Sequence, residues 1–255
     1  MNPMFDLNDR IAIVTGGNGG IGLGMARGLA MAGATVVVAG RNREKNAAAV
    51  SDLHSHRTTA IALEADVTQP EDCHAMVATT LERFGSLDIL INNAGTNIRK
   101  APQDYTLEEW NTVMDTNLTS AFVCCQAAYP AFCKGGGGKI VNIGSMTSIF
   151  GAAFAGPYGA SKGGIVQLSK ALASAWAKDN IQVNAVLPGW IDTDLTRRAR
   201  EEVEGLHDRV LARTPAGRWG EPNDLAGIAV FLASHASDFV TGAAIPVDGG
   251  YSAQA

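Results

Sequence analysis

Tyr158 and Lys162 are the two residues of this chain whose types and spacing point most directly to chemistry. They stand four residues apart behind Pro157, which suits the first turn of a helix because its missing N–H is not needed there. Residues at this spacing project from one helical face. An ammonium beside a phenol favours the charged phenol, so we expect the pKa of Tyr158 to fall from about 10 toward working pH. Such a shift suits a general acid or base, although a surface helix can carry the same pair by chance.

A glycine-rich stretch follows the first apolar segment, at residues 11–14. An apolar pattern with helical spacing comes next and ends at Gly33. Strand, glycine turn and helix in this order predict a site for a dinucleotide pyrophosphate, because glycines let phosphates approach the amides at the helix N-terminus. A glycine-rich surface turn without a ligand is the alternative. The residues that we expect to contact a cofactor here are Gly16, Asn18, Gly20, Ile21 and Gly22.

The second apolar segment, residues 35–39, runs directly into Gly40 and Arg41. Dinucleotide sites that take NAD usually carry an acidic residue near this point, where it binds the ribose diol. Here a carboxylate is absent, and a guanidinium suits a 2′-phosphate. We therefore expect NADP as the preferred cofactor, with NAD as the alternative. Arg41 could also belong to an ordinary solvated helix start, although a positive charge is slightly unfavourable at that end of a helix.

Apolar segments that read as strands alternate with helical patterns along the whole chain. The expected strands are residues 11–14, 35–39, 59–65, 87–91, 139–143, 181–187 and 243–247. Helices are expected at about 70–84, 107–134, 157–178 and 223–233. This alternation predicts an α/β fold with one doubly wound (Rossmann) parallel sheet of about seven strands and helices on both faces. With no linker or repeat dividing the sequence, we expect residues 1–255 to form a single domain.

The carboxyl ends of the strands form the edge at which such sheets bind ligands. The glycine turn, the segment 92–95 and Ser145 all follow strands directly, so we expect them at this edge. Residues 192–213 are charged and helical, and we interpret the stretch at about 190–215 as a lid over the substrate. An ordinary pair of solvated helices is the alternative.

Composition narrows the class of protein. The net charge of -5 gives no basic surface, so we expect no nucleic-acid partner. The sequence has no run of 18 apolar residues, and the first ten residues lack the apolar core of a secretory signal, so we expect no membrane association. The four cysteines form no metal-binding pattern and read as buried free thiols of a reducing compartment, which favours the cytoplasm.

With these residues in hand, the sequence resembles the short-chain dehydrogenase/reductase family over residues 7–251. The motifs that carry the resemblance are Thr15-Gly-x-x-x-Gly20-x-Gly22, Asp66-Val67, Asn92-Asn93-Ala94-Gly95, Asn117, Ser145, Tyr158-x-x-x-Lys162, Pro188-Gly189 and Asp248-Gly249-Gly250. Each motif alone is weak evidence for the family, but together the motifs follow successive strands in the order that is typical of the family. The resemblance implies a nicotinamide-dependent oxidoreductase, and it makes a cofactor-binding module without chemistry, or another chemistry on the same fold, a weaker interpretation.

The resemblance also implies a role for each matching position. Tyr158 would exchange a proton with the substrate oxygen, which Ser145 would hold. Lys162 would bind the nicotinamide ribose and lower the pKa of Tyr158, and Asn117 would anchor a water that links Lys162 to solvent. Asp66 and Val67 would contact adenine, Asn93 would support the site, and Thr193 would touch the nicotinamide amide. The remaining expected cofactor contacts are Ala94, Gly95, Pro188, Gly189 and Ile191.

Members of the family are usually tetramers. In such a homo-oligomer the helices at 107–134 and 157–178 would lie between subunits, which would place Phe122 and Trp176 away from water.

The substrate is the least determined property. The stretches 92–102 and 215–220 resemble sugar-acid members of the gluconate 5-dehydrogenase type, and Arg99 or Lys100 could meet a substrate carboxylate. A structural or intersubunit arginine is the alternative. Three apolar aromatic residues that flank the site would instead suit another small ketone or secondary alcohol. A 3-oxoacyl thioester is a further alternative, because enzymes that act on such thioesters often share these motifs. These aromatic residues are Phe150, Phe154 and Trp190.

Overall fold

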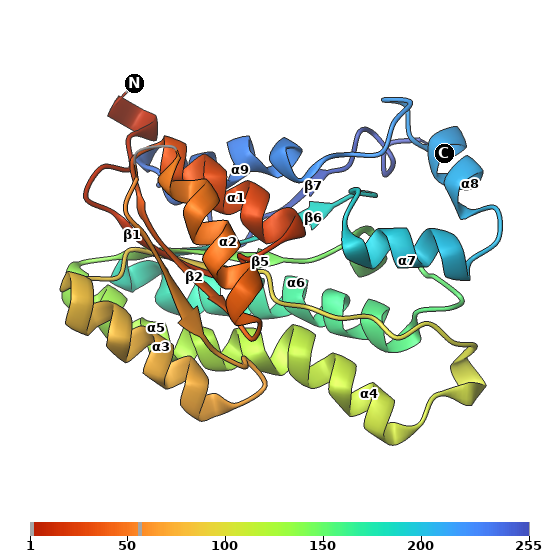
Figure 1. Ribbon diagram of the computed structural model, residues 1–255, viewed down its shortest axis with the longest axis horizontal. Coiled ribbons are helices and arrows are strands. Elements are labelled where there is room, and N and C mark those ends of the chain that lie inside the picture. Colours follow the sequence, from red (N-terminus) through yellow and green to blue (C-terminus); the bar gives the residue numbers. More distant parts are fainter. Residues whose placement is uncertain (1–2, 56–57, 255) are drawn as a thin grey trace.

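Seven parallel strands form one sheet in the computed structural model, which describes residues 3–55 and 58–254 (Figure 1). Their spatial order is β3-β2-β1-β4-β5-β6-β7, so the chain changes direction between β1 and β4. The strands are β1 (Ile11–Thr15), β2 (Thr35–Gly40), β3 (Ala60–Glu64), β4 (Ile89–Asn92), β5 (Gly138–Ile143), β6 (Ile181–Pro188) and β7 (Ala244–Val247). The predicted fold class is confirmed, with each strand close to its expected bounds.

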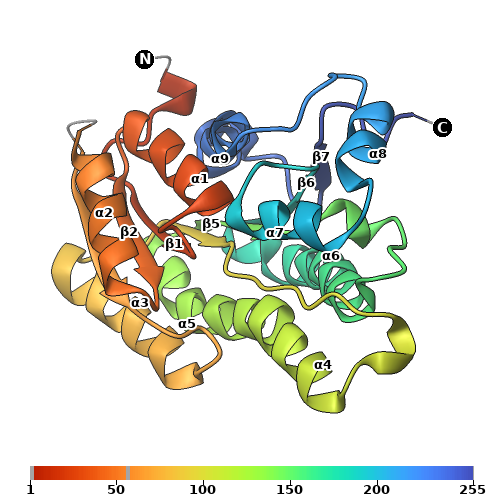
Figure 2. The same ribbon diagram turned by 45° about the vertical axis from the view of Figure 1, so that its right-hand side comes forward.

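Helices cover both faces of this sheet. Figure 2 shows α1, α2 and α9 on one side and α3, α5 and α6 on the other. The helices are α1 (Gly20–Met31), α2 (Arg43–His54), α3 (Pro70–Phe84), α4 (Leu107–Met114), α5 (Ser120–Gly135), α6 (Gly156–Trp176), α7 (Asp194–Glu202), α8 (Leu206–Arg213) and α9 (Ala226–Ala233). Within the described ranges, no helix combines the length and apolar character that crossing a bilayer requires.

The alternation of side chains along each strand divides the core into two layers. Val14 packs with Leu29 of α1 in the first layer, whereas its neighbour Ile13 packs with Met76 of α3 and Phe132 of α5 in the second. Successive side chains of a strand point to opposite faces, so a sheet covered on both sides needs apolar residues at consecutive positions. This requirement explains the unbroken apolar runs by which the strands could be predicted.

One predicted helix is interrupted. The helix expected over residues 107–134 is divided by a π-helical turn, Asp115–Thr119, which separates α4 from α5. Asn117 lies in this turn, and its side-chain amide donates hydrogen bonds to the Thr96 carbonyl at 3.0 Å and the Ser161 hydroxyl at 3.0 Å. Its oxygen accepts a bond from the Thr96 N–H at 2.7 Å. These bonds to two other segments hold Asn117 inward, and a helical sequence pattern contains no sign of them.

The cysteine prediction is correct for three of the four residues. Cys73, Cys124 and Cys125 are buried free thiols, but Cys133 is exposed. Cys133 lies in the last turns of α5, near the helix end at Gly136, where the helix leaves the core.

The close packing of α1 gives a test of the fold. A Cβ at Gly24 would lie 2.1 Å from the Pro222 carbonyl oxygen, which belongs to the turn preceding α9. We therefore expect Gly24→Ala to lower the free energy of unfolding by about 2 kcal/mol or more, because backbone must move to admit the methyl group. Urea unfolding of the purified protein measures this change.

Gly227 provides the matched control. It also lies in a helix, α9, but a Cβ there would have no described atom within 4 Å. Gly227→Ala should leave the free energy of unfolding unchanged or raise it by up to about 1 kcal/mol, as alanine favours helix. Equal stability of the two variants would show that the contact between α1 and the Pro222 turn is looser than described.

Candidate active site

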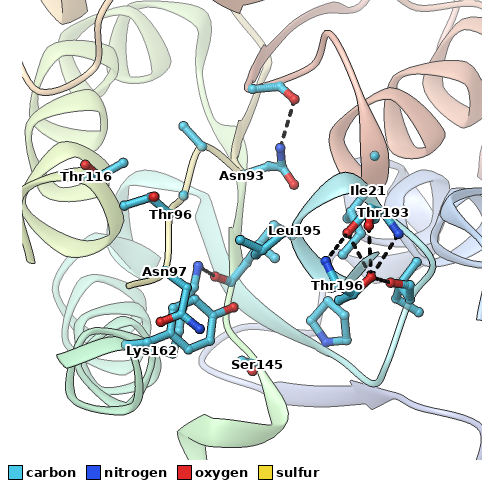
Figure 3. Close-up of a pocket in the computed structure, with 18 of the residues that line it drawn as sticks. Ile21, Asn93, Thr96, Asn97, Thr116, Ser145, Lys162, Thr193, Leu195 and Thr196 are labelled. Carbon is cyan, nitrogen blue, oxygen red and sulfur yellow. Dashed lines mark hydrogen bonds between the residues drawn. The ribbon is translucent and has the colours of Figure 1, made fainter. Parts of the chain in front are cut away.

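A cavity of about 520 Å³ opens beyond the carboxyl ends of β1, β2, β4, β5 and β6. Figure 3 shows Asn97, Ser145 and Lys162 on one side of it, and Ile21, Thr193 and Thr196 on the other. Most of the predicted site residues line this cavity: Gly16, Asn18, Gly20, Ile21, Arg41, Asp66, Val67, Asn93, Ala94, Gly95, Ser145, Tyr158, Lys162, Pro188, Gly189, Ile191 and Thr193. Gly22 and Asn117, which were also predicted as site residues, are not among the lining residues.

The glycine turn is shaped by backbone constraints that only glycine meets easily. Gly16 and Gly20 have φ angles of 62° and 50°, in the left-handed region. A Cβ at Gly22 would lie 2.4 Å from the Gly16 carbonyl oxygen, so this glycine allows the turn to pack against α1 and does not itself face the cavity. Gly19, which precedes α1, faces open space. The turn therefore offers the free N-terminal amides of α1 to an anionic group such as a pyrophosphate.

Asn93 ties this turn to the neighbouring strand end. Its amide nitrogen donates to the Thr15 carbonyl at 3.0 Å and to the Gly16 carbonyl at 3.1 Å. The Thr15 hydroxyl accepts bonds from the backbone N–H groups of Asn93 and Ala94. Asn93 thus supports the site by fixing the turn.

The end of the cavity beyond β2 and β3 is charged. The Arg41 guanidinium lies 3.7 Å from the Asp66 carboxylate. Partial burial raises the pKa of Asp66, but hydrogen bonds from Thr68 and the nearby Arg41 outweigh it, so the pKa is lower than usual. Lys45 also lines this end and is a residue that the sequence analysis missed, since a lysine in a helix start has no distinctive pattern.

Ser145 and Tyr158 meet at the other end of the cavity. Ser145 follows β5, and its hydroxyl accepts a bond from the Thr147 N–H at 3.1 Å. Tyr158 lies in the first turn of α6, which begins with Pro157 near its N-terminus, as expected. The prediction that the Tyr158 pKa falls is wrong for this structure. Burial in the cavity wall raises it, and a hydrogen bond from Ser145 and the positive charge of Arg99 offset the effect only in part.

Lys162 does not lower the Tyr158 pKa because its amine points elsewhere. The Nζ atom donates to the Ile143 carbonyl at 2.6 Å and lies 5.7 Å from the centre of the Tyr158 ring. Burial lowers the pKa of Lys162 to about 8, since the charged form loses its hydration. Burial thus favours the neutral forms of both the phenol and the amine.

Comparisons with known proteins agree with this geometry. A family model described as enoyl-(acyl carrier protein) reductase matches residues 16–252. The 2-dehydro-3-deoxy-D-gluconate 5-dehydrogenase of Escherichia coli (strain K12) is 41% identical over 251 residues, which cover 98% of each chain. The gluconate 5-dehydrogenase of Gluconobacter oxydans (strain 621H) is 40% identical over 97% of this chain and 96% of its own. The chain belongs to the short-chain dehydrogenase/reductase family.

Solved structures lead to the same family. The gluconate 5-dehydrogenase of Burkholderia cenocepacia J2315, in complex with NADP and tartrate, has a TM-score of 0.94 at 38% identity, with 99% of each chain covered. The predicted family resemblance is therefore confirmed, and this short-chain dehydrogenase/reductase is an enzyme that acts on CH–OH groups.

The segment after β4 contributes one of the two cationic candidates to the cavity wall. Of the two cationic candidates, Arg99 lines the cavity, whereas Lys100 is outside the lining and pairs with Glu109. The Arg99 side chain is only 8% exposed. Its guanidinium contacts Glu202 at 2.8 Å and donates to the Leu195 carbonyl at 3.0 Å, so it joins the segment after β4 to α7.

Asn97 and Thr147 also line the cavity, and the sequence analysis missed both. The Asn97 Oδ1 and Thr147 Oγ1 atoms are sealed from solvent and have no hydrogen-bond partner among residues 3–55 and 58–254. Buried polar atoms without a partner are uncommon in folded proteins and often mark ligand sites. A sequence pattern could have placed these residues near the site. It could not have shown that these two oxygen atoms lack hydrogen-bond partners.

The lowered pKa of Lys162 predicts how stability depends on pH. The folded chain releases this proton at a pH of about 8, below the ordinary lysine value of 10.5, so the unfolded state binds more protons between these pH values. Stability should therefore rise with pH, and by about 2 kcal/mol more in the wild type than in Lys162→Met between pH 7 and pH 9.5. Urea unfolding of both proteins at the two pH values measures the difference.

Lys170→Met is the control, because Lys170 is an exposed lysine of the same helix. It should follow the wild-type pH dependence. A Lys162→Met variant that also follows it would contradict a depressed pKa at this buried amine.

Proposed function

We propose that this enzyme interconverts a secondary alcohol and a ketone of a sugar acid, with NADP(H) as cofactor. The observation that carries the proposal is the buried Arg99 guanidinium in the wall of the cavity that also contains Ser145 and Tyr158. A guanidinium is suited to bidentate binding of a carboxylate. The relatives from Escherichia coli and Gluconobacter oxydans bear the names of enzymes of gluconate derivatives, which supports the same substrate class.

The cofactor end of the cavity supports NADP. Gly40 ends β2 and Arg41 follows it, at the position where a carboxylate would favour NAD, and Arg41 lines the cavity. The glycine turn, Asp66 and Val67 would hold the pyrophosphate and adenine, and Thr193 would lie at the nicotinamide. The Burkholderia cenocepacia relative was solved with NADP, together with the hydroxy acid tartrate.

The chain's own groups supply position and a proton. When bound, the nicotinamide supplies or accepts the hydride. Ser145 would orient the substrate oxygen beside Tyr158. Because burial raises its pKa, Tyr158 is protonated near neutral pH and ready to donate to a carbonyl oxygen in the reductive direction. Lys162, whose Nζ lies 5.7 Å from the centre of the Tyr158 ring, would bind the nicotinamide ribose, while Asn117 would hold the segment around Thr96 beside them.

Two unpaired polar atoms support a substrate with several hydroxyl groups. Asn97 Oδ1 can accept a hydrogen bond, and Thr147 Oγ1 can donate or accept one. A polyhydroxy acid would satisfy them, whereas a simple ketone would leave them unpaired. Phe150, Phe154 and Trp190 line the same cavity and support the alternative of a smaller apolar ketone or alcohol.

We also propose a domain organisation, an oligomeric state and a cellular location for this enzyme. Residues 1–255 would act as one domain in which α7 and α8, neighbouring helices within 190–215 (Figure 1), form a lid over the cavity. Trp110 and Phe122 are 39% and 41% exposed on α4 and α5, which supports burial of these helices in a homotetramer. Three buried free thiols support a cytoplasmic location.

Replacing Arg99 tests the substrate class. We expect Arg99→Met to raise the KM for 5-ketogluconate at least tenfold, because the carboxylate loses its cation, while the KM for an uncharged ketose changes less than threefold. Steady-state kinetics with NADPH measure both values. A Tyr158→Phe variant, which lacks the phenol, serves as the inactive reference.

Glu202→Gln separates carboxylate binding from the ion pair that Arg99 makes with α7. Both variants remove the pair, but Glu202→Gln keeps the guanidinium, so it should leave the KM for the sugar acid unchanged or lower it. An Arg99→Met variant with an unchanged KM would remove Arg99 from substrate binding. Preferential turnover of apolar ketones by the wild type would favour the alternative substrate.

Thr147→Val tests whether the unpaired hydroxyl belongs to substrate binding. Valine has nearly the same shape, and removal of an unpaired buried hydroxyl should leave the free energy of unfolding unchanged or raise it. The kcat/KM for the sugar acid should fall about tenfold, since one substrate hydroxyl loses its partner. Urea unfolding and kinetics on the same preparation test both statements.

Thr80→Val is the matched control. The buried Thr80 hydroxyl donates to the Met76 carbonyl at 2.8 Å, away from the cavity. That substitution should cost about 1 kcal/mol of stability and leave the kinetics unchanged. If Thr147→Val instead behaves like Thr80→Val, the Thr147 hydroxyl has a structural role.

A further inference from the structure

The segment between β4 and α4 forms part of the cavity wall, although residues 93–101 adopt neither helix nor strand. Its backbone therefore lacks the regular hydrogen bonds that fix such elements. Asn117 holds the middle of the segment, because its side chain bonds the Thr96 N–H at 2.7 Å and the Thr96 carbonyl at 3.0 Å. A second contact holds the part that follows Thr96.

Tyr105 provides this second contact. Its hydroxyl donates to the Ile98 carbonyl at 2.6 Å and accepts a bond from the Lys100 N–H at 3.3 Å. Among the described residues, the bond to Ile98 is the only hydrogen bond that the backbone of residues 97–99 makes. The same phenol oxygen lies 3.2 Å from the Phe154 carbonyl, so it also meets the segment that follows β5.

The two neighbours of Ile98 line the cavity, and they differ in how their side chains are held. The Arg99 guanidinium has its own contacts, with Glu202 and with the Leu195 carbonyl. The Asn97 Oδ1 atom is buried and has no hydrogen-bond partner within residues 3–55 and 58–254. The position of this oxygen therefore depends on the backbone next to Ile98, and so on the bond from the phenol.

We propose that Tyr105 is a positioning residue for substrate specificity. Through the Ile98 carbonyl it holds Asn97, so that the free Asn97 oxygen accepts a hydrogen bond from a hydroxyl group of the substrate. The inference rests on the proposed polyhydroxy acid as substrate. Asn97 lies on the same side of the cavity as Ser145 (Figure 3), so both side chains can meet one bound molecule. A substrate without hydroxyl groups gains nothing from this arrangement.

Tyr105 is itself fixed by the start of α4. The next residue, Thr106, caps this helix and exchanges hydrogen bonds of 3.0 and 3.1 Å with Glu109, which also pairs with Lys100. Burial raises the pKa of Tyr105, and the bond from the Lys100 N–H and the charge of Arg99 offset this effect only in part. The hydroxyl therefore keeps the proton that it donates to the Ile98 carbonyl.

Tyr105→Phe tests the inference, because it removes the hydroxyl and keeps the ring. Steady-state kinetics with NADPH compare 5-ketogluconate with 5-oxohexanoate, which has the same carbon chain, carboxylate and ketone but no hydroxyl groups. The kcat/KM for 5-ketogluconate should fall about five- to tenfold, mainly through KM, since one substrate hydroxyl loses a well-placed partner. The kcat/KM for 5-oxohexanoate should change less than twofold.

Tyr129→Phe is the matched control. The Tyr129 hydroxyl also makes a hydrogen bond, to Asp179 at 2.9 Å, but it belongs to α5 and lies outside the cavity. This substitution should leave kcat/KM for both substrates within twofold of the wild type, even where it lowers stability. A general loss of a phenol hydrogen bond is thereby separated from the positioning of Asn97.

Double variants show through which residue Tyr105 acts. Asn97→Ala alone should lower kcat/KM for 5-ketogluconate at least as much as Tyr105→Phe does, and in the Asn97→Ala background the effect of Tyr105→Phe should fall below twofold. In the Arg99→Met background the full effect should remain, because the Arg99 side chain is held by other contacts.

The wild type and the variants give distinguishable failures. A wild type that reduces neither substrate, or reduces 5-oxohexanoate as efficiently as 5-ketogluconate, would overturn the polyhydroxy acid proposal and this inference together. A wild type that prefers 5-ketogluconate, combined with equal effects of Tyr105→Phe on both substrates, would overturn the inference alone. Persistence of the full Tyr105→Phe effect in the Asn97→Ala background would do the same.

Discussion

The parallel pairing of β1 with β4 is the constraint on which the site depends. Thr15 pairs with Asn92 at the carboxyl ends of these strands, and the strand order reverses between them. The glycine turn and the segment around Asn93 therefore leave the sheet side by side, where a crevice must open. Asn93 closes this arrangement through its bonds to the Thr15 and Gly16 carbonyls, so the cofactor end is fixed by backbone geometry before any ligand contact.

Burial then determines the protonation at the other end of the cavity. It raises the pKa of the Tyr158 phenol and lowers that of the Lys162 amine, so both groups are shifted toward their neutral forms. Ser145 and Arg99 act against this trend at the phenol, one by a hydrogen bond and one by charge. The pKa of the phenol thus depends on residues from the loops after β5 and β4, and not on Lys162 one helical turn away.

Much of this arrangement could be predicted from the sequence, because it rests on local patterns. The apolar runs of a sheet covered on both faces predicted the strands, and the parallel topology brought Ser145, Tyr158 and Lys162 to one edge. The π-helical turn at Asn117 and the direction of the Tyr158 pKa could not be predicted in the same way. The first depends on bonds to Thr96 and Ser161, and the second on how deeply the phenol is enclosed, which are both properties of the assembled chain.

The helix α7 carries an acidic residue at each end, and each contacts a cation that lines the cavity: Asp194 with Lys45 and Glu202 with Arg99. A carboxylate tethered in this way is present at a high effective concentration, which for short connections reaches the millimolar range. A small free anion such as inorganic phosphate must compete with it through charge alone. A dinucleotide or a polyhydroxy acid makes further contacts along the rest of the cavity. The tethered carboxylates therefore weaken the binding of small anions more than the binding of these larger ligands.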